Sequence, residues 1–298
     1  MGYLYEVPED KKVNVIIDTD AKNEADDQYA IVHALLGAKL NVAGIVATQF
    51  SKRRTETSME ESYEECKKLV SLMDGVETKV YRGNCEELTS YENCEVSEGA
   101  KFIAEKALEY DGQIYIACLG ALTNVAAAVL YEPAIADKIT VVWVGGKKNL
   151  FDNDGFEANT RNDYRAVNIV MEKYSKIIQI PAETYSKVQV SIAELQWKVR
   201  GCGAIGEYLF EQLNDFNYRV NRFWTQGESW TLGDTTAIAF LINNHCGVLK
   251  KRKAFQVDES FKVKNLENKE IQYMDDFDSR YALEDFFAKL HLKYGRIK

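Results

Sequence analysis

The chain has 298 residues, of which 46% are hydrophobic and 28% charged, and only three prolines occur. This composition predicts a globular protein with a sizeable core and without long disordered or linker segments. The formal net charge of −9 would repel a phosphate backbone, so we expect no nucleic-acid partner and favour a small-molecule substrate.

The first half of the sequence alternates short apolar runs with amphipathic segments. Such alternation is typical of β-α-β units and predicts an α/β fold with a mostly parallel, doubly wound central sheet flanked by helices. The expected strands are residues 13–18, 41–48, 78–83, 113–120, 139–146 and 176–182, and the expected helices are residues 26–36, 58–73, 98–110, 122–133 and 165–174.

The pattern changes after Ile192, where helical segments follow one another. The expected helices are residues 193–199, 205–224 and 234–244, and two short strand-like pieces follow at residues 253–258 and 261–265. The sequence contains no repeat, low-complexity tract or convincing linker. We therefore expect one domain over residues 1–298, with a helical C-terminal elaboration.

Membrane segments and cysteines bear on location. No segment reaches the ~18 consecutive apolar residues of a membrane span, and the N-terminal MGYLYEVPEDKK lacks the apolar part of a signal peptide. The six cysteines form no C-x-x-C pair, and several lie inside expected helices or strands. We therefore expect no membrane partner, reduced thiols and a cytoplasmic location.

Acidic residues are concentrated at the end of the first expected strand. Asp18, Asp20, Asp26 and Asp27 fall within ten residues, and Glu24 lies among them. Side chains alternate along a strand, so Asp18 and Asp20 share one direction, while Asp26 and Asp27 open the next helix. A pair of acids at a helix start can be a simple cap, because it suits the positive end of the helix dipole. Four converging carboxylates, however, would repel one another without a cation.

The chemistry of this cluster favours a hard cation. Ligands bind at the carboxyl ends of parallel strands in open α/β sheets, and convergent oxygens there suit Ca²⁺ or Mg²⁺. Zinc is disfavoured because none of the three histidines is spaced with another as a ligand pair. Ca²⁺ acidifies a bound water less than Zn²⁺ does, so a carboxylate must also accept the proton. Asp20 is placed to hold the cation and to accept that proton.

Four motifs occur in an order that resembles a known family. They are DTD-x5-DDQYA, LGALTNVAAAVLYEP, VVWVGG followed by FEANTRNDYRA, and LGDTTAIAF. Each is weak alone, but the ordered set from Val13 to Phe240 resembles the nucleoside hydrolase family, the inosine-uridine-preferring nucleoside N-ribohydrolases. The resemblance implies a nucleoside hydrolase-like fold and Ca²⁺-dependent hydrolysis of the N-glycosidic bond of purine or pyrimidine ribonucleosides, releasing ribose and free base. It also implies a nucleoside or ribosyl substrate as partner, and a homo-oligomer, either a dimer or a tetramer.

For the metal site, the resemblance assigns roles to individual positions. It implies that Ca²⁺ is bound by Asp20, Asp27, the main-chain carbonyl of Thr123 and Asp234. A backbone oxygen is reasonable there, because Ca²⁺ readily accepts carbonyl ligands. The resemblance also implies that Asp20 is the catalytic residue that activates the attacking water, and that Asp18 orients the loop or its neighbour.

For the substrate, the resemblance implies that Asp26 binds a ribose hydroxyl and that Asn153, Glu157 and Asn159 surround the ribose. Carboxylates and amides can complement sugar hydroxyls, which both donate and accept hydrogen bonds. They would also place negative charge near a developing oxocarbenium ion. Trp230 is a candidate to stack on a purine, although a tryptophan in a helix is more often a core residue.

The loop after the first strand departs from the family pattern. Five residues, AKNEA, separate Asp20 from Asp26, where the family motif has three that include Pro and Gly. Lys22, Asn23 and Glu24 either reach the pocket or form an exposed polar loop, and the pattern does not decide between these alternatives.

Two further departures concern the leaving group and the second strand. Gly233 stands where many family members carry a histidine that acts as an acid towards the departing base, so no general acid is evident. The segment ATQFSKRRTETSMEESY replaces a short T-T-x-x-G-N region, and Gln49, Ser51 or Asn23 could replace its asparagine. The basic residues 52–54 are either solvated surface or, if they line the pocket, a sign of an anionic substituent such as a phosphate.

Three other functions remain open at this stage. Gly233 and the longer loop are compatible with hydrolysis of another ribosyl or glycosyl compound. A non-catalytic nucleoside- or ribose-binding homologue would retain the metal without turnover. A phosphohydrolase that prefers Mg²⁺ could use the same carboxylates, but this function leaves Glu157 and Asn159 unexplained.

Overall fold

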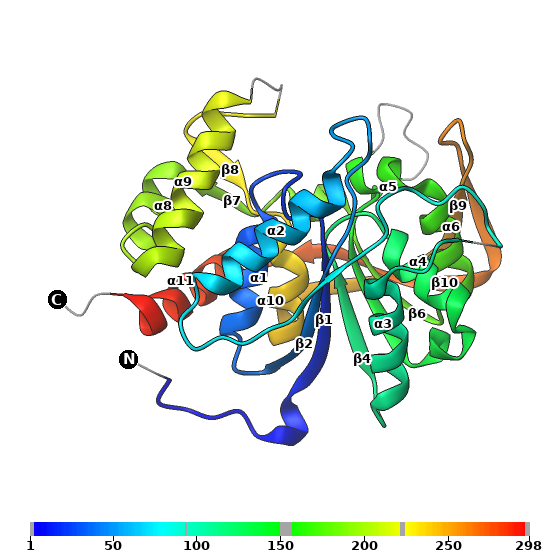
Figure 1. Cartoon of the computed structure of the whole chain (residues 1–298), viewed down its shortest axis with the longest axis horizontal. Coiled ribbons are helices and arrows are strands. Elements are labelled where there is room, and N and C mark those ends of the chain that lie inside the picture. Colours follow the sequence, from blue (N-terminus) through cyan, green and yellow to red (C-terminus); the bar gives the residue numbers. More distant parts are fainter. Residues whose placement is uncertain (1–2, 93, 150–156, 221–223, 296–298) are drawn as a thin grey trace.

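The computed structural model of the chain describes residues 3–92, 94–149, 157–220 and 224–295. A central sheet of eight strands has the order β3-β2-β1-β4-β5-β6-β10-β9 (Figure 1). Its strands are β1 (Val13–Thr19), β2 (Leu40–Ala47), β3 (Val80–Arg82), β4 (Ile114–Cys118), β5 (Ile139–Val144), β6 (Lys176–Ile180), β9 (Gly247–Val257) and β10 (Val263–Phe277). All neighbours in this order pair in parallel except β10 and β9. The predicted mostly parallel sheet is confirmed.

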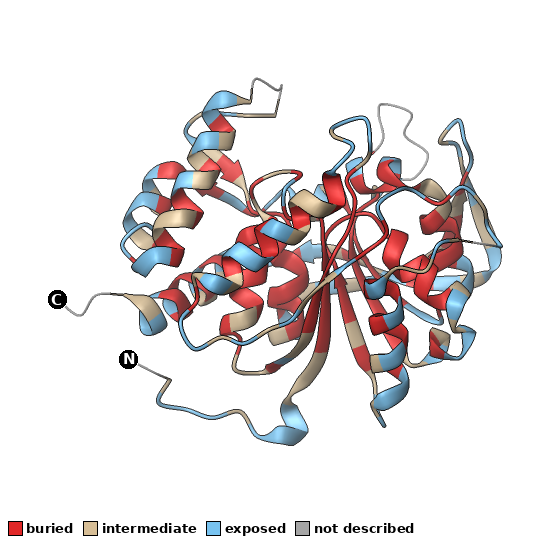
Figure 2. Cartoon of the chain, in the orientation of Figure 1, coloured by how far each residue is buried: buried red, intermediate tan, exposed pale blue. Residues whose placement is uncertain are grey.

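Helices cover both faces of the sheet, as predicted. The helices on these two faces include α1 (Asp27–Leu36), α2 (Ser58–Ser71), α3 (Glu98–Glu109), α4 (Thr123–Tyr131), α6 (Tyr164–Lys173), α10 (Thr235–Ile242) and α11 (Ser279–Tyr294). One apolar cluster joins α1, α2, α10 and α11 to sheet residues such as Ile17, and a second joins α3, α4 and α6 to residues such as Ile16. Adjacent strand residues face opposite sides, so both isoleucines are buried. Figure 2 shows the buried side of these helices turned towards the sheet.

The strand order reverses direction beside β1. The chain first builds outwards from β1 to β2 and β3, and then crosses to β4 on the other side of β1. At such a switch point the connections diverge and leave a crevice beyond the carboxyl ends of the strands. β1 ends at Thr19 and β4 ends at Cys118, so the loops that begin with Asp20 and Leu119 border this crevice.

The C-terminal part is helical, as predicted, but it also contains strands. Its further elements are β7 (Gln189–Ser191), α8 (Ile192–Lys198), α9 (Gly203–Arg219) and β8 (Ser229–Thr231). β7 and β8 pair as a small antiparallel sheet, which the sequence pattern did not predict. The helix expected over residues 205–224 ends at Arg219, and Trp230 lies on β8.

The final segment differs most from expectation. The two pieces expected at residues 253–258 and 261–265 are parts of a hairpin whose strands, β9 and β10, have 11 and 15 residues. β9 forms an edge of the sheet and carries charged residues on its exposed side, which hide the apolar periodicity of a strand. α11 was not predicted, although Phe286 and Leu290 on it are fully buried four residues apart.

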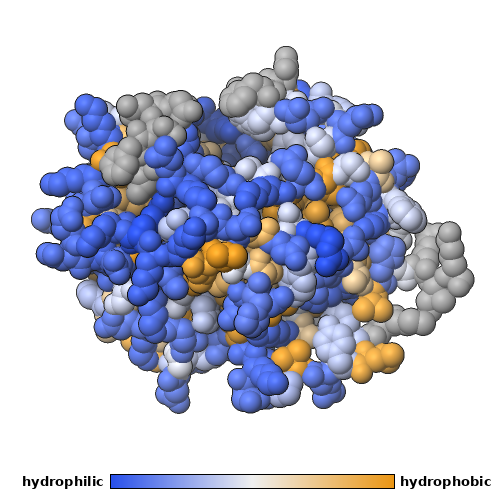
Figure 3. Space-filling model, turned by 180° about the vertical axis from the view of Figure 1, so that it is seen from behind, coloured by the Kyte–Doolittle hydropathy of each residue, from blue (hydrophilic) through white to orange (hydrophobic). Residues whose placement is uncertain are grey.

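Within the described residues, no helix is both long and apolar enough to cross a membrane. The face seen from behind is mostly hydrophilic, and its apolar residues lie in small separate areas (Figure 3).

Candidate functional site

A cavity of about 120 Å³ lies at the switch point of the sheet. Its wall is formed by the loop after β1, the ends of β4 and β5, and the segments at α5 (Ala158–Asn162), α7 (Ala182–Tyr185) and the start of α10. The lining residues are Asp20, Asn23, Glu24, Asp26, Asp27, Leu119, Val144, Glu157, Ala158, Asn159, Tyr185 and Asp234. The fold thus brings together six of the residues that the sequence had suggested for a site, although they are far apart along the chain.

Three carboxylates converge on one point of this cavity. Asp26, Asp27 and Asp234 each offer an oxygen atom, and these atoms lie within 4.8 Å of one another. Asp26 and Asp234 occupy the N-cap positions of α1 and α10, yet neither side chain accepts a capping hydrogen bond from its own helix. Their carboxylates are therefore not used as simple caps, and two positive helix ends face the same point.

Asp20 lies beside this group and is oriented by its neighbours. Its Oδ2 accepts a hydrogen bond from Nδ2 of Asn23 at 2.9 Å. A β-carbon on Gly120 would lie 2.7 Å from Oδ1 of Asp20, so only glycine allows the turn after β4 to approach the carboxylate this closely. Thr19 donates a hydrogen bond from its hydroxyl to Asp27, which fixes the second acid.

The electrostatics of the cluster are unfavourable without a counter-charge. Burial raises the pKa of Asp20, Asp26, Asp27 and Asp234. The charge of Asp27 further raises the pKa of Asp20 and of Asp26, and the charge of Asp26 does so for Asp234. The lining residues named above include no Lys, Arg or His. A set of convergent oxygens of this kind fits a hard divalent cation such as Ca²⁺ or Mg²⁺, and not zinc.

Glu157 and Asn159 form another part of the wall and hold three elements together. Glu157 caps α5: its Oε2 accepts from the backbone N–H of Gly146 at 2.7 Å and of Thr160 at 2.9 Å, and its Oε1 accepts from that of Asn159 at 2.9 Å. Nδ2 of Asn159 donates to the carbonyls after β4 and at the end of β5, at 2.8 and 2.9 Å. Burial raises the pKa of Glu157, and the three backbone N–H groups oppose this rise.

Tyr185 is a lining residue that the sequence did not reveal. It ends α7, and its hydroxyl lies 3.4 Å from Oε1 of Glu157. Its ring packs against Gly233, where a β-carbon would lie only 2.8 Å from Cδ2 of the ring. No local pattern marks this tyrosine, because its place depends on how β6 leads into α7 beside the start of α10.

The loop after β1 divides its side chains between two directions. Asn23 and Glu24 line the cavity, whereas Lys22 points away and pairs with Glu65 of α2. Burial raises the pKa of Glu24 to about 7, against the lowering effect of Arg54, whose guanidinium lies 3.8 Å away. The sequence left open whether this loop reaches the pocket or is exposed. In the structure Asn23 and Glu24 reach the cavity, and Lys22 does not.

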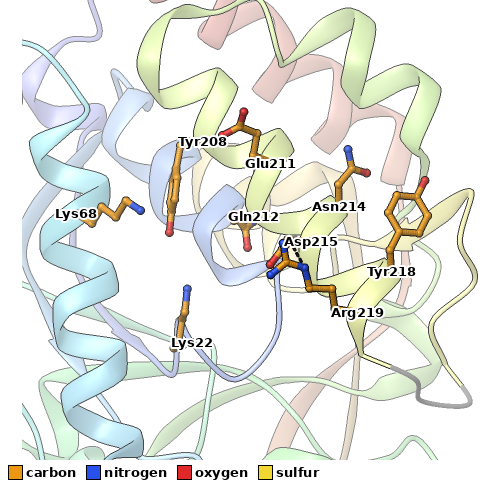
Figure 4. A pocket seen from close by; sticks show the side chains of 9 residues that line it. All are labelled: Lys22, Lys68, Tyr208, Glu211, Gln212, Asn214, Asp215, Tyr218 and Arg219. Carbon is orange, nitrogen blue, oxygen red and sulfur yellow. Dashed lines mark ion pairs between the residues drawn. The ribbon is translucent and has the colours of Figure 1, made fainter.

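Lys22 instead lines a second hollow of about 720 Å³ between the loop, α2 and α9 (Figure 4). Several charged groups in this hollow are partnered by side chains of the protein. Arg219 pairs with Asp215 at 2.6 Å, and Nζ of Lys68 lies 3.9 Å from the ring centre of Tyr208. Its described lining residues include no converging trio of carboxylates like that of the cavity.

Other residues considered for the site are not among those that line the cavity. Thr123 begins α4 and is buried, and its hydroxyl donates to Asp163 and accepts from Gln49, so Gln49 does not face the cavity. Asp18 accepts from Asn124 on α4, away from the lining residues. Trp230 packs edge-on against Phe216 and is not among the lining residues. Asn153 lies outside the described residues.

Comparisons with known proteins identify the family and several relatives of this chain. The family model for inosine-uridine preferring nucleoside hydrolases matches residues 15–273. The chain is 24% identical to uridine nucleosidase 1 of Arabidopsis thaliana over 247 residues, which are 68% of this chain and 73% of that protein.

Solved structures share the fold at low sequence identity. The purine-preferring ribonucleoside hydrolase from Gardnerella vaginalis has a TM-score of 0.77 at 20% identity, with 93% of this chain and 98% of that chain covered. The inosine-uridine preferring nucleoside hydrolase from Bacillus anthracis has a TM-score of 0.72 at 17% identity, with 94% and 99% covered.

Proposed function

The chain belongs to the inosine-uridine preferring nucleoside hydrolase family, and we propose that it hydrolyses the N-glycosidic bond of ribonucleosides in a Ca²⁺-dependent reaction. It is a hydrolase acting on N-glycosyl compounds, as the family resemblance of its sequence had implied. The observation that carries the proposal is the gathering of four aspartates, Asp20, Asp26, Asp27 and Asp234, in one cavity at the switch point of the sheet, where oxygens of the last three lie within 4.8 Å of one another. A small cavity lined by acids and amides is suited to a sugar and a cation, and not to a polyanion.

Asp20, Asp27 and Asp234, with the main-chain carbonyl of Thr123, are the proposed ligands of the cation. When bound, Ca²⁺ supplies positive charge that holds and acidifies a water molecule and offsets the buried carboxylates. The turn at Gly120, which packs against Asp20, supports a ligand from the segment that begins α4.

The reaction itself uses groups of the chain. Asp20 accepts a proton from the water that attacks the anomeric carbon, while the bond from that carbon to the base breaks. Asp26, Glu157 and Asn159 bind the ribose, as does Asn153 in this proposal. Their negative charge and oxygen atoms stabilise the positive charge that develops on the sugar more than they stabilise the neutral substrate.

The test is release of free ribose from a panel of purine and pyrimidine ribonucleosides, with and without chelator. Chelator-sensitive release that returns with Ca²⁺ and not with Mg²⁺ would support the whole proposal. Recovery of ribose release with Mg²⁺ and not with Ca²⁺ would show that the cation is Mg²⁺. Binding of inosine without release of base would favour a non-catalytic homologue, and release from other glycosides alone would favour a different aglycone.

The remaining expectations about the chain are also proposals. All six cysteines are free thiols in the structure, which supports a reduced, cytoplasmic setting. Both apolar clusters pack on one sheet, which supports a single domain over residues 1–298. The family resemblance supports a dimer or tetramer. Light scattering of the purified protein would test this oligomeric state.

A further inference from the structure

The cavity is rich in hydrogen-bond acceptors and poor in donors. Six of the described lining residues are carboxylic acids. The lining residues whose side chains carry hydrogen-bond donors are Asn23, Asn159 and Tyr185. A base that leaves an N-glycosidic bond takes the bonding electron pair with it, so negative charge develops on its ring. Without a hydrogen-bond donor, the carboxylates that line the cavity would repel this negative charge. The reaction proposed above therefore needs a donor that is free to turn to the substrate.

One of the three donors is fully committed to the protein, and another is committed in part. Both hydrogens of Nδ2 of Asn159 are used by backbone carbonyls, at 2.8 and 2.9 Å. One of the two hydrogens of Nδ2 of Asn23 is used by Asp20, at 2.9 Å, which holds this amide beside the acid that accepts the water proton.

Among the side-chain donors of the described wall, Tyr185 makes the longest hydrogen bond. Its contact with Oε1 of Glu157 is long, at 3.4 Å, and the same oxygen already accepts from the backbone N–H of Asn159 at 2.9 Å. Little is lost if this hydroxyl turns to another acceptor. The ring itself is held in place, because it packs on Gly233 so closely that a β-carbon there would lie 2.8 Å from Cδ2.

We propose that Tyr185 is a substrate-contacting residue of the hydrolysis, and that its hydroxyl donates a hydrogen bond to the departing base. This inference rests on the proposed function. The bond from water oxygen to the anomeric carbon forms, and the bond from that carbon to nitrogen breaks with its electrons on nitrogen. One water proton goes to Asp20, Tyr185 keeps its proton while donating, and the base takes a proton from solvent on release.

The surroundings of Tyr185 keep the hydroxyl protonated. Burial raises its pKa well above the ordinary value, and the charges of Glu157 and Asp234 raise it further. The group therefore remains a donor over the whole working range of pH. A side chain larger than hydrogen at position 233 would displace the ring, so Gly233 and Tyr185 form one unit.

The test compares two kinds of leaving group. Inosine and uridine need help for the departing base, whereas 4-nitrophenyl β-D-riboside releases a stable anion that needs none. Tyr185→Phe keeps the ring and removes the hydroxyl, so it should lower kcat for the nucleosides about 10- to 100-fold. Its kcat for the nitrophenyl riboside should stay within about threefold of the wild type. Tyr174→Phe, which removes a buried hydroxyl bonded to Val125 in the other core cluster, is the matched control and should change neither rate.

Gly233→Ala gives a second measurement that does not remove the hydroxyl. It should displace the ring and cause the same selective loss, and thermal unfolding checks that both variants are folded. Equal losses on both leaving groups would mean that Tyr185 only positions Glu157, and an unchanged rate would mean that it has no role; either result overturns the inference. If the wild type cleaves neither nucleosides nor the nitrophenyl riboside, the proposed function itself fails, and the inference fails with it.

Discussion

Lys22, in the loop after β1, forms an ion pair with Glu65 of α2, with 2.9 Å between Nζ and Oε2. Glu65 is only 5% exposed. Its Oε1 accepts from the hydroxyl of Tyr208 on α9 at 2.6 Å and from Nε2 of Gln28 at 3.3 Å. Gln28 in turn donates to the carbonyl of Ala21 in the same loop. One buried carboxylate thus holds the loop that carries Asn23 and Glu24 into the cavity.

Glu65→Ala should therefore lower both stability and activity. It removes the acceptor shared by Lys22, the half-buried Tyr208 and the buried Gln28, so we expect a loss of roughly 1–3 kcal/mol in the free energy of unfolding. Glu64→Ala is the matched control, because Glu64 pairs with Lys67 on the exposed side of α2, and such pairs contribute under about 1 kcal/mol. Urea unfolding and ribose release measure the two effects. Equal behaviour of the two variants would show that Glu65 does not support the loop.

Asp234→Asn tests the cation site without relying on turnover. In chelator the variant should be at least as stable as the wild type, because burial and the charges of Asp26 and Asp27 make the ionised carboxyl unfavourable. Ca²⁺ at about 100 times its Kd should stabilise the wild type by about 2.7 kcal/mol and leave the variant unchanged. Thermal unfolding with and without Ca²⁺ measures this difference.

The control for this pair of measurements is Asp215→Asn, which removes a carboxylate paired with Arg219 on the surface of α9. It should keep the full response to Ca²⁺. If Ca²⁺ stabilised Asp234→Asn as much as the wild type, Asp234 would not be a ligand of the cation.

The sheet and the acids of the site could be predicted because each has a local signal. Alternating apolar runs mark buried parallel strands, and Asp20, Asp26 and Asp27 directly follow β1, so the fold class places them at a ligand-binding edge. Asp234, Glu157 and Asn159 were found through motif order alone, since nothing local places them beside β1. Their meeting in one cavity depends on the crossovers between strands.

Other parts of the molecule have no local signal. Tyr185 reaches the cavity because Gly233, 48 positions later in the sequence, leaves space for its ring, and only the folded chain brings the two together. The long hairpin was missed because β9 is an edge strand, where charged side chains are tolerated on the open side. Trp230 was a candidate to stack on a purine, but it lies on β8 and packs on Phe216, and no local signal in the sequence marks that contact.

His33 should make the protein less stable in mild acid. It is fully buried, its Nε2 lies 2.7 Å from Oδ2 of Asp285, and its Nδ1 has no hydrogen-bond partner. Burial lowers its pKa below 6.5 despite the hydrogen bond to Asp285, which raises it. The unfolded state then binds more protons than the folded state below pH 6.5 or so, so stability falls as the pH falls through this range.

The comparison that isolates this effect is with His33→Phe, since the titration of the other groups is shared except at Asp285, whose pKa lies below its ordinary value and thus outside this pH range. Below about pH 6.5 the free energy of unfolding of the wild type should decline relative to that of the variant, at a limiting slope of about 1.4 kcal/mol per pH unit. Urea unfolding at pH 7.5, 6.5 and 5.5 measures the difference. A constant difference across these values would show that His33 titrates alike in both states.

Neutral ribosides should be much better substrates than their 5′-phosphates. The basic residues 52–54 do not form a phosphate site: Lys52 pairs with Glu86, Arg53 donates to the carbonyl of Arg161, and Arg54 lies beside Glu24 at the cavity. The six carboxylic acids of the wall would repel a phosphate, and that repulsion outweighs the attraction of one partly neutralised guanidinium.

We expect kcat/KM for inosine to exceed that for inosine 5′-monophosphate by roughly 100-fold or more, which corresponds to about 2.7 kcal/mol. Arg54→Gln should not narrow this ratio, and Lys52→Ala, at a pair far more exposed, serves as its control. A monophosphate cleaved as fast as inosine, and lost selectively in Arg54→Gln, would instead identify Arg54 as an anion-binding residue.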